Sequence, residues 1–193
     1  MALLNLWSSP SDDSRRQEAR LLARLRAGDE SAFETVYERH MPPLYRYALR
    51  MTGSASEADD VVQDLFLTLI RDARGFDPAR GELRSYLYGV ARKIVLNRLP
   101  VELQAGDDTP EPAVKDDPFE ALDRAQRLEL VRTAVAALPA GYREVVALCD
   151  LEEMSYADAA LVLNCAVGTV RSRLHRARAM LLERMEKLKC GTA

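Results

Sequence analysis

A cluster of cationic side chains lies near the C-terminal end of the chain, in the segment VGTVRSRLHRARAMLL that spans residues 167–182. Its members are Arg171, Arg173, His175, Arg176 and Arg178. Guanidinium groups donate hydrogen bonds in a fixed fork that suits phosphate oxygens and the edges of bases. Because the whole chain has a formal net charge of -3, this positive charge is local. It indicates either a surface that contacts phosphates or a helix face exposed to solvent.

A second group combines cations with aromatic rings. Arg84, Tyr88 and Arg92 recur every four residues and therefore share one face of a helix, with Tyr86 and Lys93 nearby. Arginines that meet phosphates and rings that stack on unpaired bases suit single-stranded DNA. The alternative is that the tyrosines belong to a core and the arginines are solvated. An apolar stripe on the same helix is expected to be buried: Leu83, Leu87, Val90 and Ile94.

A third group is acidic. Carboxylates crowd the first half of the segment SEADDVVQDLFLTLIRDARG, where they also favour the positive end of a helix dipole. They are Glu57, Asp59, Asp60 and Asp64, with Gln63 beside them. A metal-binding acid motif of the kind found in isoprenoid synthases is one interpretation, but those enzymes need a larger helical cavity. A solvated acidic helix face is the other.

Each group must be positioned by a helix, and helical periodicity extends over almost the whole chain of 193 residues. For the C-terminal cluster, an apolar stripe is predicted to pack inward: Val167, Val170, Leu174, Ala177 and Leu181. The first turn of this helix contains Gly168 and Thr169, which are small enough for close approach to a phosphate. The preceding segment SYADAALVLN predicts a short helix capped by Ser155, and Asn164 tolerates a left-handed turn. This order predicts a helix-turn-helix, with an ordinary helical hairpin as the alternative.

The remaining pattern predicts an all-α protein of two small helical domains joined by a flexible acidic linker. The domains are expected at residues 15–99 and 119–188, and the linker at 100–118 is rich in proline and acid. Within the first domain, Ser31 and Glu34 form a capping-box pattern, and the pair Pro42–Pro43 is expected to bend or interrupt a helix.

Several function classes receive no support from the sequence. No apolar run approaches the length of a membrane span, and no signal sequence is recognisable, so we expect a cytoplasmic protein without membrane contact. Cys149, Cys165 and Cys190 are far apart, and His40 and His175 are distant from them, so neither a metal site nor a cofactor is expected. No catalytic constellation is recognisable, and we therefore do not expect an enzyme.

These motifs together resemble a known family. LPAGYREVV, SYADAA and VGTVRSRLHRAR resemble region 4 of bacterial RNA polymerase sigma factors of the extracytoplasmic-function (ECF) type, group 4 of the sigma-70 family. AGDESAFETVYERHMPPLYRYALRMTGSASEADDVVQDLFLTLI and FDPARGELRSYLYGVARKIVLNRL resemble region 2. The two matches occur in the right order across the linker. A stand-alone helix-turn-helix regulator is the alternative, but such a protein does not need the region 2 match.

The resemblance implies specific partners and roles. Region 4 would read the -35 promoter element through Gly168, Thr169, Arg171, Ser172, Arg173, His175 and Arg176. Region 2 would recognise and open the -10 element through Phe76, Arg80, Arg84, Tyr88, Arg92 and Lys93, where Lys93 stands at a position that many members fill with Asn. The acidic helix would dock on the basic clamp coiled coil of core RNA polymerase through Asp59, Asp60, Gln63, Asp64 and an exposed pair, Phe66 and Leu67.

The resemblance also implies how such a protein is used. It would form a complex with core polymerase, including its flap, on promoter DNA, and would serve a particular set of genes as an alternative factor. Members of the family are commonly held inactive by an anti-sigma protein that masks both domains.

Overall fold

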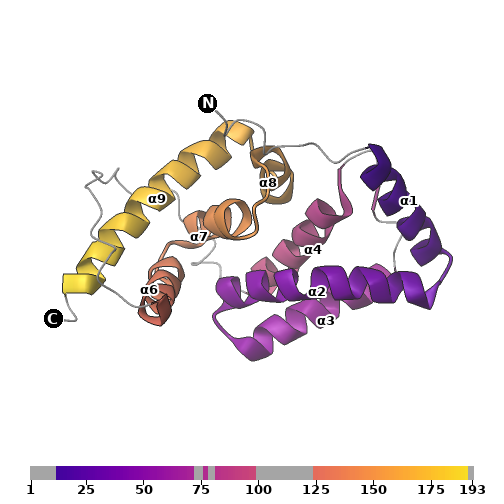
Figure 1. Cartoon of the computed structure of the whole chain (residues 1–193), viewed down its shortest axis with the longest axis horizontal. Coiled ribbons are helices and arrows are strands. Elements are labelled where there is room, and N and C mark those ends of the chain that lie inside the picture. The colour runs from indigo at the N-terminus through magenta and orange to yellow at the C-terminus, as the bar shows by residue number, and fades with distance from the viewer. Residues whose placement is uncertain (1–11, 72–75, 78–80, 99–123, 191–193) are drawn as a thin grey trace.

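The computed structural model describes residues 12–71, 76–77, 81–98 and 124–190, and the regular structure within these ranges is helical (Figure 1). The predicted all-α architecture of two helical domains is confirmed. The predicted linker, residues 100–118, lies outside the described residues. Among the described helices, none has both the length and the apolar character needed to cross a membrane.

The first domain packs its helices around an apolar core. They are α1 (Asp12–Arg26), α2 (Glu30–Thr52), α3 (Ala55–Arg71) and α4 (Leu83–Arg98). Helices α2 and α3 pack along each other, and α4 contacts both of them. Gly53 ends α2 in the left-handed conformation, with φ 73°, and its N–H donates to the carbonyl of Leu49, as expected for a glycine stop. The short connection brings α3 back along α2 and creates a shared surface.

Helix α2 contains the pair Pro42–Pro43 in its interior. The helix continues through Pro42 and Pro43 to Thr52, so of the two expected effects the prolines do not cause an interruption. The prolines supply no N–H to the preceding turn. The burial of flanking side chains, such as Leu44 and Tyr47, nevertheless holds the chain in the helix.

The beginning of α2 also differs from the expectation. Asp29 rather than Ser31 caps the helix, and its Oδ1 accepts hydrogen bonds from the backbone N–H groups of Ser31 and Ala32. Arg24 donates to Asp29 at 2.8 Å, and this contact and the Ser31 hydroxyl lower the pKa of Asp29 to about 2. Asp29 therefore stays charged as the cap of α2, and its carboxylate accepts from two backbone N–H groups that lack partners within the helix.

The second domain contains the predicted helix-turn-helix. Its elements are α6 (Arg124–Ala136), α7 (Ala140–Val146), the π-helical segment η3 (Ala147–Leu151), α8 (Tyr156–Leu163) and α9 (Val167–Cys190). Ser155 caps α8 by accepting from the N–H of Asp158, and Asn164 ends it in the left-handed conformation with φ 52°. Both predictions are confirmed. The turn lets α9 pack Val170, Leu174 and Ala177 of the predicted stripe on α7 and α8. Val167 was predicted in the same stripe but is 38% exposed, because it lies at the first turn beyond the buried contact, and Leu181 is half-buried.

The two domains contact each other directly. Helix α4 packs against α8, and α2 contacts α6, α7 and η3 (Figure 1). The buried apolar side chains of both domains form one continuous cluster. The sequence pattern predicted two separate domains and gave no indication of a contact between them. This contact covers part of the surface of α4 that was predicted to bind the -10 element.

Candidate nucleic-acid interface

The first half of α9 presents polar and cationic side chains opposite its buried stripe. Gly168, Arg171, Ser172, His175 and Arg176 are exposed, whereas Val170, Leu174 and Ala177 are buried beneath them. Thr169 and Arg173 are half-buried. A helix with this division can rest on the domain with one side and offer donors to a DNA groove with the other.

Contacts within the domain distinguish the cations of α9 from one another. The guanidinium of Arg171 lies 5.9 Å from the centroid of the Tyr156 ring, which supports its side chain from the α8 side. Arg178 instead donates to both carboxylate oxygens of Asp150, at 3.1 and 2.5 Å. Arg173 is close enough to Glu144 to favour the charged form of that carboxyl group. Arg171 and Arg176 are therefore the arginines of α9 best placed to reach a ligand from solvent.

The second predicted group, which we call the α4 face, comprises Arg84, Tyr88 and Arg92. Tyr88 is 1% exposed, and its ring packs edge-on against Tyr47 of α2 at 5.3 Å between centroids. Arg84 lies over the Tyr88 ring at 5.7 Å. The three side chains share one face of α4, but Tyr88 belongs to the buried core, as the alternative of core tyrosines expected. The second domain covers them in this arrangement.

The covering groups are two glutamates of the second domain. Oε1 of Glu144 accepts from Tyr47 at 3.0 Å and from Arg92 at 2.9 Å. Oε2 of Glu152 accepts from Tyr88 at 3.0 Å, and its backbone carbonyl accepts from Arg84. Burial raises the pKa of the Glu144 carboxyl group, although Arg92 and Tyr47 oppose the shift. Burial also raises the pKa of Tyr88, so its hydroxyl remains a donor.

The rest of the predicted -10 group is dispersed. Phe76 is 3% exposed, its ring contacts Tyr86 at 5.4 Å between centroids, and its carbonyl accepts from Arg26. Lys93 is exposed, and Arg80 lies outside the described residues. A cavity of about 200 Å³ borders Phe76, and Leu161 of α8 contributes to its wall. The second domain therefore also reaches the surroundings of Phe76, which the resemblance assigned to the -10 element.

The buried stripe of α4 is shifted from the expected one. Leu83 and Leu87 are buried as predicted, but Ala91 and Val95 take the buried positions further along the helix. Val90 and Ile94 are half-buried instead. Because the stripe is turned in this way, Tyr88 lies inside the contact between the domains.

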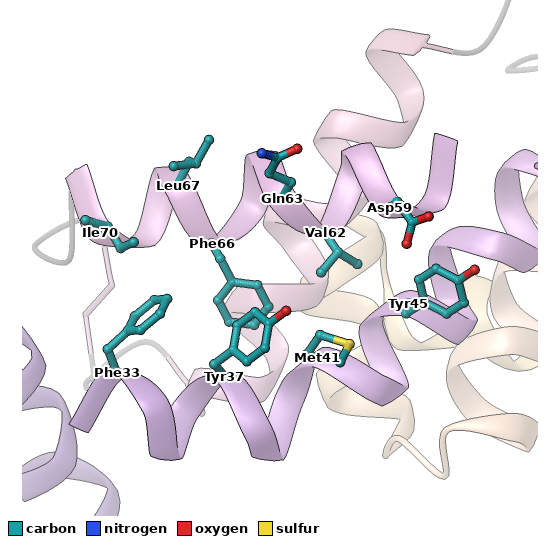
Figure 2. A pocket seen from close by; sticks show the side chains of 10 residues that line it. All are labelled: Phe33, Tyr37, Met41, Tyr45, Asp59, Val62, Gln63, Phe66, Leu67 and Ile70. Atoms are coloured by element: carbon teal, nitrogen blue, oxygen red, sulfur yellow. The ribbon is translucent and has the colours of Figure 1, made fainter. Parts of the chain in front are cut away.

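The acidic helix α3 divides into two faces. Asp59, Gln63 and Leu67 line a groove of about 470 Å³ between α2 and α3, whose floor and rim are largely aromatic and aliphatic (Figure 2). Phe66 also lines it but is only 4% exposed, so its expected exposure is wrong. Its ring packs against Tyr37 at 4.7 Å between centroids. We call this feature the α2–α3 groove.

Asp60 and Asp64 lie on the other face of α3. Arg98 of α4 donates to Asp60 at 3.2 Å and to Asp64 at 2.6 Å. These hydrogen bonds, of which the one donated to Asp64 has the strongest influence, raise the pKa of Arg98. The pair is exposed, so it contributes little to stability. Asp60 and Asp64 are thus partly neutralised, whereas Asp59 borders the apolar groove.

Two parts of this site were missed by reasoning from the sequence. The α2 wall of the groove comes from Phe33, Tyr37, Met41 and Tyr45. Their spacing of four residues places them on one helix face and could have been recognised. Glu144 carried a weaker signal, since it interrupts an otherwise apolar helix face in REVVAL. No pattern in the sequence around Glu152 indicated that it would be buried in the contact between the domains.

Metal chemistry receives no structural support within the described ranges, where no group of His, Cys, Asp and Glu residues is arranged to hold an ion. Cys149 and Cys165 are half-buried thiols, and burial raises the pKa of Cys149 to about 11. Such a thiol is protonated near neutral pH and is a poor nucleophile.

Family comparisons match both domains. The family model for Sigma-70 region 2 matches residues 36–100, and that for Sigma-70, region 4 matches residues 128–181. The chain is 35% identical over 181 residues to the ECF RNA polymerase sigma factor SigM of Mycobacterium tuberculosis, which covers 91% of this chain and 88% of the relative. It is 27% identical over 180 residues to the ECF sigma factor SigW of Bacillus subtilis, covering 86% of this chain and 96% of the relative.

Two solved structures have a similar fold. The structure of CnrH in complex with the cytosolic domain of CnrY superimposes with a TM-score of 0.67 at 28% identity, covering 88% of this chain and 97% of that one. The sigma factor RpoE of Bartonella quintana, in complex with the anti-sigma factor NepR, superimposes with a TM-score of 0.62 at 26% identity. That match covers 80% of this chain and 96% of the RpoE chain.

Proposed function

The chain belongs to the ECF group of the sigma-70 family, and we propose that its promoter contacts are divided between the α4 face and the first half of α9. It is an alternative sigma factor, which binds core RNA polymerase and directs promoter-specific transcription initiation. We infer that region 2 comprises residues 15–99 and region 4 residues 119–188, on either side of a linker at 100–118. The protein acts by binding, and no bond is made or broken by its own side chains.

The -35 element is read by α9 in this proposal. The observation that supports it is the helix-turn-helix of α8 and α9, with Arg171, Ser172 and Arg176 exposed on the side away from the core. Arg171 and Arg176 contact base edges or phosphates. Gly168 and Thr169 approach a phosphate at the beginning of the helix, where the positive end of the helix dipole favours an anion. Arg173, which is half-buried beside Glu144, orients the helix and contacts the backbone of the DNA at its edge.

The -10 element is opened by the α4 face. Arg84 and Arg92 bind phosphates of the displaced strand, and Tyr88 stacks on an unpaired base. Phe76, Arg80 and Lys93 extend this surface. Capture of an unstacked base offsets the few kcal/mol that unstacking costs. In the arrangement described here the α4 face is in contact with Glu144 and Glu152, so promoter opening requires that the second domain move away from it.

The polymerase clamp is bound at the α2–α3 groove. Asp59 and Gln63 border an apolar surface in which Leu67 is 38% and Ile70 58% exposed. An acidic rim around apolar side chains suits a basic partner helix, because charge directs the encounter and the burial of apolar area supplies affinity. Asp60 and Asp64 add negative charge beside this surface while remaining bound to Arg98.

An anti-sigma protein is the further partner in this proposal. One of the similar solved structures contains a sigma factor bound to an anti-sigma factor. We place the protein in the cytoplasm, where core polymerase and promoter DNA are found.

The experiment that tests these assignments is transcription by the reconstituted holoenzyme from a library of randomised promoters. Arg171→Ala and Arg176→Ala are expected to relax the base preference at -35, since a bidentate arginine contact is worth about 1–3 kcal/mol of discrimination. Arg178→Ala is the matched control, because Arg178 lies on the same helix but binds Asp150. Arg92→Ala is expected to slow opening at -10 and leave the -35 preference intact. Equal effects of Arg171→Ala and Arg178→Ala on the -35 preference would contradict the assignment.

A further inference from the structure

The contact between the two domains is made by buried charges rather than by apolar groups alone. Glu152 is 3% exposed, and its carboxylate accepts from Arg50 at 2.7 Å, from Arg46 at 3.4 Å and from Tyr88 at 3.0 Å. Glu144 is 5% exposed and binds Tyr47 and Arg92. Both glutamates belong to the second domain, and all of these donors belong to the first.

The backbone conformation around Glu152 directs this residue towards the first domain. The π-helical segment η3 ends directly before it, and Glu153 adopts a left-handed conformation with φ 53°. For a residue other than glycine this conformation costs about 1 kcal/mol or more and persists only where its surroundings hold it. The N–H of Met154 then closes the turn on the carbonyl of Leu148. This turn directs the Glu152 side chain and its carbonyl into the first domain.

A third connection lies beside the glutamates. The guanidinium of Arg143 donates to the carbonyls of Arg50 and Met51, at 3.5 and 3.4 Å. These carbonyls belong to the last turn of α2, where helical partners are lacking and a cation is favourable. The second domain therefore satisfies free groups of the first domain with a positive side chain as well as with two negative ones.

The chemistry of the two glutamates matches that of the expected nucleic-acid ligand. A carboxylate presents anionic oxygens to arginine and tyrosine donors, as a phosphate does. Arg92 and Tyr88 bind Glu144 and Glu152 here, and the same side chains are assigned above to the -10 strand. A strand and the second domain cannot use these donors at the same time.

We propose that region 4 is an intramolecular competitor of the promoter strand, in which Glu144 and Glu152 occupy the phosphate- and base-binding donors of region 2 and keep the free chain closed. The inference rests on the proposed role of the α4 face. The ion pairs of Glu144 and Glu152 with arginines of the first domain suit a reversible closure. Buried ion pairs contribute little net stability compared with the same charges separated and solvated, so the closed state can open at low cost. The free protein then has low affinity for DNA, and the domains separate when other contacts hold them apart.

The test uses the full-length chain in the absence of polymerase. The double variant Glu144→Gln/Glu152→Gln keeps the shape of both side chains but removes their charge. Its matched control is Asp150→Asn, which removes one negative charge from an ion pair within region 4. A third variant, Glu152→Lys, places a cation against Arg46 and Arg50 and is used only to force opening. Each protein is examined by small-angle scattering and by fluorescence anisotropy with a labelled pool of random single-stranded oligonucleotides.

The expected result is a larger radius of gyration for both Glu152 variants, and tighter binding of the oligonucleotide pool by the double glutamine variant. If one wild-type molecule in ten is open, the affinity rises by roughly tenfold on full opening. Asp150→Asn should behave as wild type in both measurements. Adding Arg92→Ala to the double variant should remove the gain in affinity.

The outcomes separate this proposal from the one on which it rests. Unchanged scattering and unchanged oligonucleotide binding in all variants would overturn the closure, even if the holoenzyme initiates transcription normally and loses opening with Arg92→Ala. An opened variant without any gain in binding would overturn the competition. If the holoenzyme also opened promoters normally with Arg92→Ala, the fault would lie in the assignment of the α4 face itself.

Discussion

Removal of the exposed aliphatic side chains of the α2–α3 groove is expected to weaken the complex with core polymerase. Leu67 is 38% exposed and Ile70 58% exposed. Full burial of such a side chain is worth about 1.5–3 kcal/mol, so covering the exposed fractions supplies roughly 0.6–1.1 kcal/mol for Leu67 and roughly 0.9–1.7 kcal/mol for Ile70. The double variant Leu67→Ser/Ile70→Ser should therefore raise the dissociation constant by about 10- to 100-fold.

The measurement is a titration of labelled sigma factor with core polymerase at two salt concentrations. Thr68→Ala is the matched control, because Thr68 is exposed on α3 between the two positions but does not line the groove. Charge reversal at Asp59 should lower the association rate more strongly at low salt than at high salt. An unchanged dissociation constant for the double serine variant, with helicity retained, would refute the assignment of the groove to the clamp.

Three further predictions concern stability and promoter selection. Burial and the nearby Arg39 and Arg84 lower the pKa of His40 to about 4 from 6.5, so between these pH values the unfolded chain binds more protons than the folded chain. The free energy of unfolding, measured in urea, should therefore fall by about 2–3 kcal/mol from pH 7.5 to 4.5, and the variant His40→Gln should lose this part of the pH dependence. Leu174→Ala, at a position that is 1% exposed, should destabilise region 4 by about 2–5 kcal/mol and abolish -35 dependent transcription, with thermal unfolding as the check on its cause. Ser155→Ala should remove the cap of α8 and cost about 1 kcal/mol in the same assay, while the -35 base preference of the folded fraction stays unchanged; a changed preference would mean that Ser155 also contacts DNA.

Local sequence patterns predicted helix ends correctly where the residue at the end itself determines the conformation. Gly53, Ser155 and Asn164 stop or cap helices through their own conformational preferences, and each does so in the structure. The α2 cap was misplaced because Ser31 and Asp29 both have capping side chains, and Arg24 from the preceding helix stabilises the aspartate. That contact depends on how α1 packs, which no pattern within α2 contains.

The faces of helices were predicted less well, because a face is defined by its neighbours. Asp60 and Asp64 share the predicted acidic helix with Asp59, yet α4 supplies Arg98 to the first two and only Asp59 borders the groove. Phe66 was expected on the surface but packs against Tyr37 of α2. The residue types were correctly recognised as a polar and an apolar set. Their separation into two surfaces required the packing of three helices.

The same limit explains why the contact between domains was invisible in the sequence and why its chemistry is informative. Arg84, Tyr88 and Arg92 were selected as donors for nucleic acid, and the structure places carboxylate and carbonyl oxygens against those donors. A surface built to bind a polyanion will bind any anionic groups that the chain can bring to it, because the donors gain most from charged acceptors. Glu144 and Glu152 are brought there by α7 and by the strained turn after η3, at a cost in desolvation that raises the pKa of Glu144. Since an apolar interface of the same area would not compete with phosphates, we infer that the ionic character of this contact would couple domain closure to DNA binding.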